Sequence, residues 1–269
     1  MERALGLMAG AGDLPGRAAA EARRQGWRVV AFAFAEAAGL AEQADELVAA
    51  RLTDLGPVLE ALATRGIGAV LFAGKLGKQE MLARAGEADE AGRGMIRRGL
   101  SDSVLAEMAV AALENLGIEV LDQRRFLGAW LATGGALASR TPTPEQWEEI
   151  RAGFELARYL AGRGIGQTVV RSRGVTVALE AVEGTDETIR RGTRLAGPGA
   201  VIVKAVAPGH DYRFDIPAVG PATLRAMAEG RAAVLALDGG KVLLLERPQM
   251  IELAERAGIA VVTVDGRER

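Results

Sequence analysis

The chain has 269 residues, 49% of them hydrophobic and 25% charged, which is the composition of a globular protein with one large or two ordinary domains. Its formal net charge of −2 argues against nucleic acid as the partner. Because it has no cysteine and only one histidine, disulfides and thiol chemistry are excluded, and any metal is expected to be a hard cation held by carboxylates, magnesium or manganese.

The chain begins without the apolar run of a signal peptide, and no apolar stretch is long enough to span a membrane. Together with the lack of cysteine, this predicts a soluble protein of the cytoplasm. The sequence leaves the oligomeric state open and is compatible with a homodimer.

The first half of the chain predicts parallel βαβ units. Apolar runs predict buried strands at Leu5–Gly10, Trp27–Phe34, Ile67–Ala73 and Ile118–Leu121. Helices are expected between them, because a proline opens and a glycine closes the segments at Pro15–Gly26 and Pro57–Gly66. A further helix is expected at Val104–Leu116, after a charged, glycine-rich loop at Gly86–Gly94. We interpret residues 1–132 as one doubly wound, Rossmann-like domain of α/β class.

The second half predicts another α/β domain, at residues 144–269, after a Gly-, Thr- and Pro-rich linker at 133–143. Helices are expected from Pro144, from the Gly184 turn to about Gly192, at Pro221–Glu229 and at Pro248–Ala257. Strands are expected at Thr168–Arg171, Val175–Ala181, Ala233–Asp238, Lys241–Leu245 and Ile259–Val264. Gly239-Gly240 predicts a hairpin between two of these strands, so some antiparallel pairing is expected.

The stretch Val201–Gly220 joins an apolar strand to a proline-stiffened loop with four ionisable residues close together: His210, Asp211, Arg213 and Asp215. On an extended segment Arg213 and Asp215 would face the same side. Asp215 could then act as a general base or bind a metal, while Lys204 and Arg213 neutralise phosphate oxygens. The alternative is an Arg–Asp ion pair that locks the loop, with His210 as an acid or base or as a contact to a loop carbonyl.

Two turns could bind phosphate in the first half. Gly10-x-Gly12, followed by Asp13 and Leu14, leads from a strand into a helix, where backbone amides can approach an anion. Proline stands where a dinucleotide fingerprint has its third glycine, so the pattern is weak evidence for NAD. The alternative is a tight turn between strand and helix. Gly74-Lys75 ends another strand, and ligands of open α/β sheets bind at that edge.

The segment from Glu180 to Asp186 places acidic residues around a glycine turn. Such carboxylates can hold a divalent cation or accept sugar hydroxyls, or they can cap the helix that follows. We favour capping for Thr185 and a site role, including metal binding, for Glu183, with Gly184 and Asp186 beside it.

The chain resembles the LpxI family of UDP-2,3-diacylglucosamine pyrophosphatases. Four segments from both halves carry the resemblance: GLMAGAGDLP at 6–15, VLFAGK at 70–75, VALEAVEGTDETIRR at 177–191 and VIVKAVAPGHDYRFDIPAVGPATL at 201–224. The specific ones are the Glu-Gly-Thr-Asp turn and the Asp-x-Arg-x-Asp-x-Pro run. His210 departs from the family pattern, which has glutamine there.

The resemblance implies two α/β domains with the ligand between them, and a magnesium-dependent hydrolysis of UDP-2,3-diacylglucosamine to UMP and 2,3-diacylglucosamine 1-phosphate (lipid X) in lipid A synthesis. It makes Asp215 the essential acidic residue, with Asp211, Arg213 and Lys204 around the reaction. The glycine turns, Lys75 and His210 would contact the lipid-linked nucleotide sugar, whose acyl chains would bring the protein to the inner face of the membrane.

Two other function classes are compatible with these residues. A nicotinamide-dependent oxidoreductase would use the Gly10 turn, and the incomplete glycine fingerprint disfavours it. A non-catalytic sensor of a nucleotide or lipid phosphate would bind its ligand without turnover, and its output would survive replacement of Asp215 by asparagine.

Overall fold

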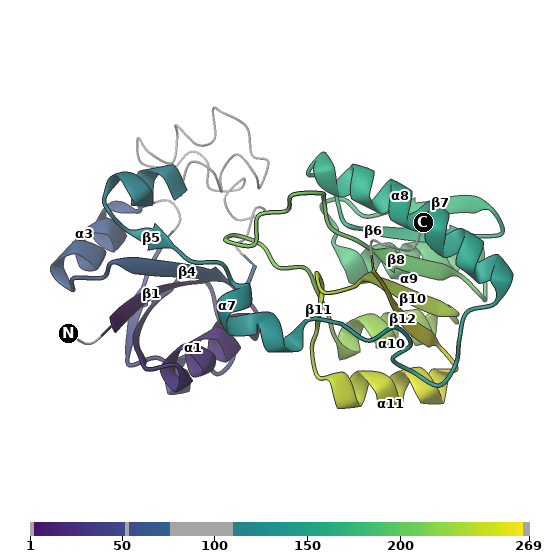
Figure 1. The fold of residues 1–269 in the computed structure, drawn as a ribbon, viewed down its shortest axis with the longest axis horizontal. Coiled ribbons are helices and arrows are strands. Elements are labelled where there is room, and N and C mark those ends of the chain that lie inside the picture. Colours follow the sequence, from purple (N-terminus) through teal and green to yellow (C-terminus); the bar gives the residue numbers. More distant parts are fainter. Residues whose placement is uncertain (1–2, 52–53, 76–109, 266–269) are drawn as a thin grey trace. The chain divides into compact units, whose positions relative to one another are not determined.

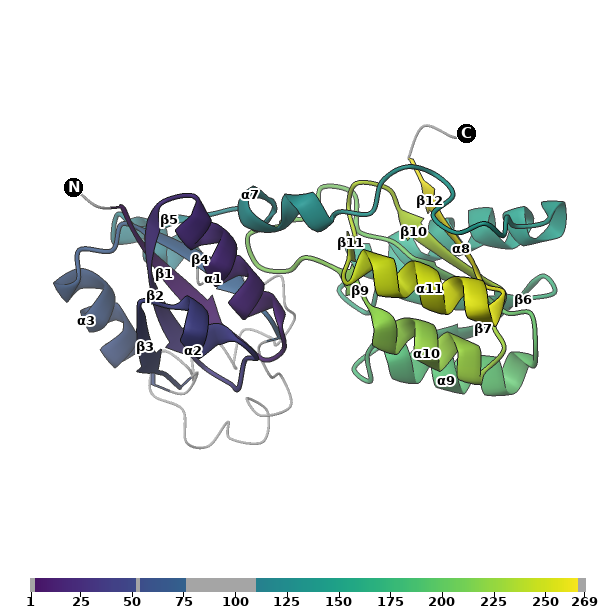
Figure 2. The same ribbon diagram turned by 90° about the horizontal axis from the view of Figure 1, so that it is seen from below.

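The structure is a computed structural model that describes residues 3–51, 54–75 and 110–265. It divides into two compact units, each an α/β assembly (Figures 1 and 2). The first unit comprises residues 1–129 together with 211–215, and the second comprises 130–210 together with 216–269. The loop expected at 86–94 and the first part of the helix expected at 104–116 lie outside the described residues, whereas residues 110–115 are helical.

The first unit contains a five-stranded sheet in the order β3-β2-β1-β4-β5, in which every pairing is parallel. The strands are β1 (Arg3–Ala9), β2 (Trp27–Ala33), β3 (Glu46–Ala49), β4 (Ala69–Ala73) and β5 (Glu119–Val120). The central strands are almost continuously apolar because both of their faces are covered. The doubly wound interpretation is therefore confirmed.

Helices cover both faces of this sheet (Figure 2). They include α1 (Leu14–Arg24) on one face and α3 (Gly56–Thr64) on the other. The short helices α2 (Leu40–Gln43) and α7 (Arg124–Leu127) pack against α1, and the 3₁₀ turn Gly128–Trp130 follows α7. On one face, α3 packs closely, since a Cβ atom on Gly6 of β1 would lie 2.8 Å from the Leu62 side chain. Both α1 and α3 begin with a proline in the first turn, as the sequence predicted.

The second unit contains a mixed sheet in the order β12-β10-β8-β6-β7. Its strands are β6 (Thr168–Ser172), β7 (Val175–Leu179), β8 (Val201–Lys204), β10 (Val234–Asp238) and β12 (Ala260–Val264). The strands β8, β10 and β12 are parallel, whereas β6 pairs antiparallel with both β7 and β8. The carboxyl ends of β7, β8, β10 and β12 therefore share one edge with the start of β6.

Helices again cover both faces of the second sheet. The long helix α8 (Pro144–Gly162) lies on one face, and α9 (Thr185–Ala196), α10 (Pro221–Glu229) and α11 (Arg247–Ala257) lie on the other (Figure 1). A capping box at Thr143 and Gln146 fixes the start of α8. Inside α8, Gly153 allows a close approach to β8, because a Cβ atom there would lie 2.5 Å from Val203.

The hairpin expected at Gly239-Gly240 is wrong. Both edges of β10 are already hydrogen-bonded, to β8 and β12, so the chain after the glycines cannot pair with it. Instead β11 (Leu243–Leu244) forms a separate two-stranded parallel sheet with β9 (Ala218–Val219). The amide of Gly239 donates to Val264 of β12 and that of Gly240 to Ala132.

The segment expected as a linker lies within the second unit. Leu137 donates its amide to Val261 of β12, and Gly135 and Thr263 exchange hydrogen bonds. Leu137 and Ala138 are buried in the core of this unit. Within the ranges that the structure describes, no helix combines the length and the apolar character needed to cross a bilayer.

Candidate functional site

The two glycine turns of the first unit meet at the carboxyl edge of its sheet. Gly10 donates its amide to Ala73 at 2.8 Å, and Ala11 and Lys75 exchange two backbone hydrogen bonds of 2.8 and 3.0 Å. No side chain fits at either glycine, since a Cβ atom on Gly10 would lie 2.5 Å from the Lys75 carbonyl oxygen and one on Gly74 2.7 Å from that of Ala11. The two turns predicted separately from the sequence are thus one structure.

The residues after Gly10 lead this edge into α1. Gly12 has a φ of +102°, which glycine adopts freely, and helix α1 begins at Leu14 directly afterwards. Asp13 occupies the N-cap position, but its side chain makes no capping hydrogen bond and forms an ion pair with Arg17 at 3.2 Å. The first turn of α1 therefore has amides that no side-chain cap satisfies, a common feature of phosphate-binding turns.

Residues 211–215, which we call the strap, belong to the first unit although the chain before and after them belongs to the second. Tyr212 is buried, and its carbonyl oxygen accepts the amide of Gln123 at 3.0 Å. The guanidinium of Arg124 lies over its ring, with 4.1 Å between the Arg124 Cζ atom and the ring centroid. The ring of Phe214 packs on that of Phe72 in β4, with 4.8 Å between the centroids.

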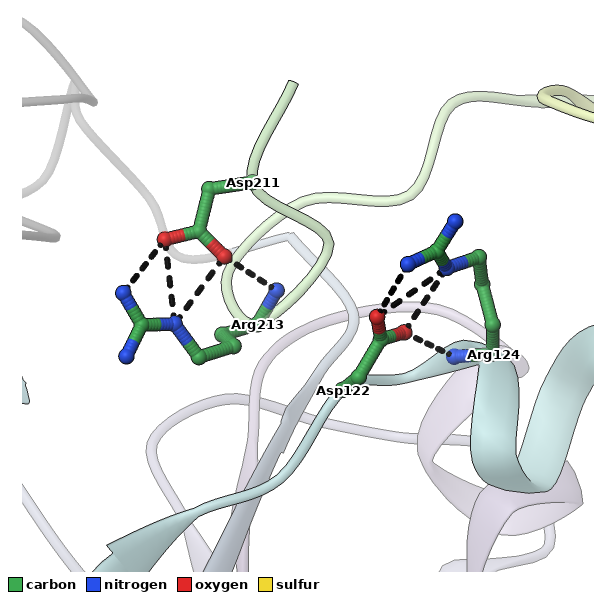
Figure 3. Close-up of polar contacts among 4 residues, drawn as sticks. All are labelled: Asp122, Arg124, Asp211 and Arg213. Atoms are coloured by element: carbon green, nitrogen blue, oxygen red, sulfur yellow. Dashed lines mark hydrogen bonds and ion pairs between the residues drawn. The ribbon is translucent and has the colours of Figure 1, made fainter. Parts of the chain in front are cut away.

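The strap and the segment after β5 repeat one local arrangement, Asp-x-Arg (Figure 3). Asp211 accepts the backbone amide of Arg213 at 3.0 Å and binds its guanidinium, at 2.8 Å for the closest pair. In the same way Asp122 accepts the amide of Arg124 at 2.8 Å and binds its guanidinium. Burial raises the pKa of Asp122, but the hydrogen bonds from Arg124 outweigh it and hold the pKa below its ordinary value.

The chain turns at residues 212–214, so the expectation of an extended segment with Arg213 and Asp215 on one side is wrong. The guanidinium of Arg213 binds Asp211 and, at 3.1 Å, Glu114, which is the loop-locking ion pair considered as the alternative. Asp215 is exposed at the end of the strap. His210 belongs to the second unit, where its amide donates to Ala207 at 3.2 Å.

A buried charged cluster lies at the carboxyl edge of the second sheet. Lys204 ends β8 and is 4% exposed, and its ammonium donates to the Thr185 hydroxyl at 2.7 Å and lies 4.0 Å from the carboxylate of Glu180. The Thr185 hydroxyl donates in turn to the carboxylate of Glu180 at 2.9 Å. This carboxylate also accepts the amide of Gln167 at 3.2 Å. Burial raises the pKa of Glu180, yet the charge of Lys204 and these hydrogen bonds bring it below its ordinary value.

The roles that we predicted around the start of α9 are distributed differently. Gly184 is the N-cap residue, so the capping interpretation of Thr185 is wrong: its hydroxyl is used by Lys204 and Glu180. Glu183 accepts the amide of Ala181 at 3.2 Å and binds Arg191 at 2.6 Å. Its own backbone N–H and Arg191 hold its pKa below the ordinary value, which points to a role in fixing the helix start.

Two further side chains complete the carboxyl edge of the second sheet. Asp186 accepts the hydroxyl of Thr223 at 2.8 Å and thereby ties α9 to α10. Asp238, at the end of β10, is fully buried and binds Arg158 at 3.0 Å and Lys241 at 3.2 Å. No local pattern in the sequence indicates the Asp238 cluster, because Arg158 lies on helix α8 and Lys241 follows the glycine pair after β10.

The carboxylates of the described residues are the side chains that would bind a hard metal ion. Among the described residues, no three His, Cys, Asp or Glu side chains are grouped so that they could hold a metal ion by themselves.

Family models match both halves of the chain. Residues 4–130 match the LpxI N-terminal domain, and residues 133–262 match the LpxI C-terminal domain. The chain belongs to the LpxI family. A family member from Caulobacter vibrioides, named UDP-2,3-diacylglucosamine pyrophosphatase LpxI, is 29% identical over 289 residues and covers 99% of both chains.

Solved structures outside the LpxI family give only distant similarity. The N5-carboxyaminoimidazole ribonucleotide synthetase of Thermotoga maritima has a TM-score of 0.27 and 13% identity, over 67% of this chain and 42% of that one. Glycinamide-RNase-transformylase T of Mycobacterium tuberculosis has a TM-score of 0.25 and 17% identity, over 67% and 44%. The chain thus spans less than half of these proteins, and the scores carry no argument about function.

Proposed function

We propose that this LpxI family member hydrolyses the diphosphate of UDP-2,3-diacylglucosamine, releasing UMP and 2,3-diacylglucosamine 1-phosphate. The observation that carries the proposal is that both domains of the family match in order along the chain, and that the named relative aligns over 99% of it. This is a step of lipid A biosynthesis. The structure adds support residue by residue, because each unit has polar groups at the carboxyl edge of its sheet, where ligands of open α/β sheets bind.

Asp215 is the proposed acidic residue of the reaction. It is exposed on the first unit, where a carboxylate can take a proton from the water that attacks phosphorus. Asp211 and Arg213 are bound to each other, which favours a structural role for both. Magnesium, the proposed cofactor, would be held by Asp215 with diphosphate oxygens, and when bound it would neutralise charge on the phosphates and polarise water.

The phosphate contacts are proposed in both units. In the first, the proposed contacts are the amides of the first turn of α1, directly after Gly12, and the exposed side chain of Lys75. In the second, the proposed cation is the ammonium of Lys204 at the end of β8, beside the hydroxyl of Thr185. A charge so deeply buried acts strongly on a phosphate, because little water screens it.

The substrate would also decide where the protein works. UDP-2,3-diacylglucosamine carries two acyl chains, so we propose that a cytoplasmic protein takes it from the inner face of the membrane. The binding would be peripheral and would depend on the lipid.

The proposal is tested by incubating the purified protein with UDP-2,3-diacylglucosamine and Mg²⁺ and measuring UMP by mass spectrometry. We expect wild type to release UMP, Asp215→Asn to lose at least a hundredfold in rate while still binding substrate, and Asp54→Asn, another exposed aspartate of the first unit, to match wild type. Folded wild-type protein that binds the substrate without releasing UMP would instead indicate a sensor, and binding of NAD would indicate an oxidoreductase.

A further inference from the structure

We propose that Tyr212 and Phe214 of the strap, together with Arg124, are positioning residues that place Asp215 for the reaction. This inference rests on the proposed function. It gives the strap, residues 211–215, a role in catalysis, namely holding Asp215 in place.

The first anchor is Tyr212. Only 6% of this residue is exposed, although the loop around it is at the surface. Its backbone is fixed by the amide of Gln123 at 3.0 Å, and its ring is covered by the guanidinium of Arg124 at 4.1 Å. A cation over an aromatic face is favourable, most of all where water is partly excluded.

Arg124 is itself held in place for this contact. Asp122 accepts two bonds from its Nε atom, both 3.0 Å, and its backbone amide at 2.8 Å, which fixes the plane of the guanidinium (Figure 3). Lysine could not reproduce this arrangement, because it lacks the planar group that can bind a carboxylate and stack on a ring at the same time. The Asp122–Arg124 pair therefore forms a rigid cover for Tyr212.

The second anchor is Phe214, the residue directly before Asp215. Its ring packs on Phe72 of β4, with 4.8 Å between centroids, and joins the hydrophobic core under this face of the sheet. Consecutive Cα atoms are about 3.8 Å apart, so a fixed Phe214 leaves the backbone of Asp215 little freedom. From Ile216 onward the chain belongs to the second unit, where the carbonyl of Pro217 accepts the amide of Leu243 at 2.7 Å.

Asp215 is thus an exposed carboxylate directly after a residue that is packed on the first unit. Catalysis is sensitive to such placement, since a displacement of about 1 Å can cost about a hundredfold in rate. Ordinary substrate contacts would change binding, whereas a residue that acts through Asp215 should change turnover. This difference separates positioning from a general structural role.

The experiment compares Arg124→Met with Arg125→Met, a neighbouring arginine whose guanidinium lies over Trp27 instead. Tyr212→Phe, which keeps the ring, and Tyr212→Leu, which removes it, complete the set. We expect Arg124→Met and Tyr212→Leu to lower kcat about ten- to a hundredfold with KM within about threefold of wild type. Arg125→Met and Tyr212→Phe should keep most of the activity.

Two further measurements make the result decisive. Hydrogen exchange of amides in residues 211–217 should be faster in Arg124→Met and unchanged in Arg125→Met, which shows that the strap is loosened. In an Asp215→Asn background, assayed over long incubations, Tyr212→Leu should lower the residual rate no further, because both changes remove the same contribution.

The outcomes separate the two proposals. If wild type releases no UMP, the proposed function fails and the positioning role fails with it. If wild type is active and the strap exchanges faster while kcat stays at the wild-type level, the positioning role alone is overturned. A further loss of rate in the Asp215→Asn background would overturn it as well. Circular dichroism of each variant shows that the units are folded before any rate is compared.

Discussion

Removing the charge of Lys204 should destabilise the second unit by an amount that depends on pH. The substitution Lys204→Met keeps most of the side-chain volume but leaves the carboxylate of Glu180 buried without its cation, which lies 4.0 Å away in wild type. Breaking a buried ion pair from one side costs about 3–5 kcal/mol. We expect the lower end, about 3 kcal/mol at pH 7, because Glu180 keeps its hydrogen bonds to Thr185 and to the amide of Gln167.

The contribution of Glu180 to the unfolding free energy should change with pH in opposite directions in wild type and in Lys204→Met. In wild type the pKa of Glu180 lies below its ordinary value of 4.5, so the pair stabilises the fold above that pH and this contribution is lost as the pH falls through the lowered pKa. In Lys204→Met, burial is no longer opposed by the charge of Lys204, so we expect the pKa of Glu180 to rise above its ordinary value and its protonation at low pH to stabilise the fold. The difference in unfolding free energy should therefore shrink as the pH is lowered from 7 to 4.

The measurement is urea unfolding at several pH values, with the second unit followed through hydrogen exchange of amides in β8. The double variant Lys204→Met with Glu180→Gln should regain much of the lost stability, because no buried charge is left unpaired. A destabilisation of the same size at pH 4 and pH 7, or one that the second substitution fails to reduce, would refute the reasoning.

Two predictions concern close packing and a second buried charge. Gly10→Ala should lower the free energy of unfolding by about 2 kcal/mol and weaken UDP binding in calorimetry, because its Cβ atom would lie 2.5 Å from the Lys75 carbonyl oxygen. Gly68→Ala, which has open space around it, should be tolerated, and equal effects of the two substitutions would contradict the contact. Asp238→Asn should lower the thermal midpoint, at a cost of about 2 kcal/mol in unfolding free energy, because a fully buried carboxylate loses its charge beside two cations. Asp265→Asn, at an exposed position, should leave the midpoint unchanged. A wild-type midpoint for Asp238→Asn would contradict the prediction.

Much of the fold follows from local signals in the sequence. Continuous apolar runs closed by glycine, as at Ala69–Ala73 before Gly74, identify strands buried on both faces, and prolines mark the first turns of α1, α3, α8 and α10. The meeting of the Gly10 and Lys75 turns follows too, because both end parallel strands and must lie at the same edge. The short strand Glu46–Ala49 was missed, since its residues alternate between half-buried and exposed.

The failures come from contacts that only the tertiary structure decides. Gly239-Gly240 has the local chemistry of a hairpin, but two other strands already occupy the edges of β10. Glu183 attracted attention as the acidic residue beside the glycine turn, whereas Glu180 is the one that meets Lys204. The sequence marks the ionisable residues of the strap but not its anchoring, because Tyr212 and its partner Arg124 are far apart in the sequence.

The strap also bears on how the protein is made. A ribosome releases residues 1–129 before it has begun the second unit, so Phe72 and the amide of Gln123 must wait for partners that emerge much later. Docking of the strap onto the first unit is then a slow, long-range folding step. Its earliest time is determined by the translation of β6, β7 and β8, which precede the strap in the chain. The segment that ends in Asp215 arrives last in the first unit, so a product truncated before residue 211 would contain the first sheet without the proposed catalytic carboxylate.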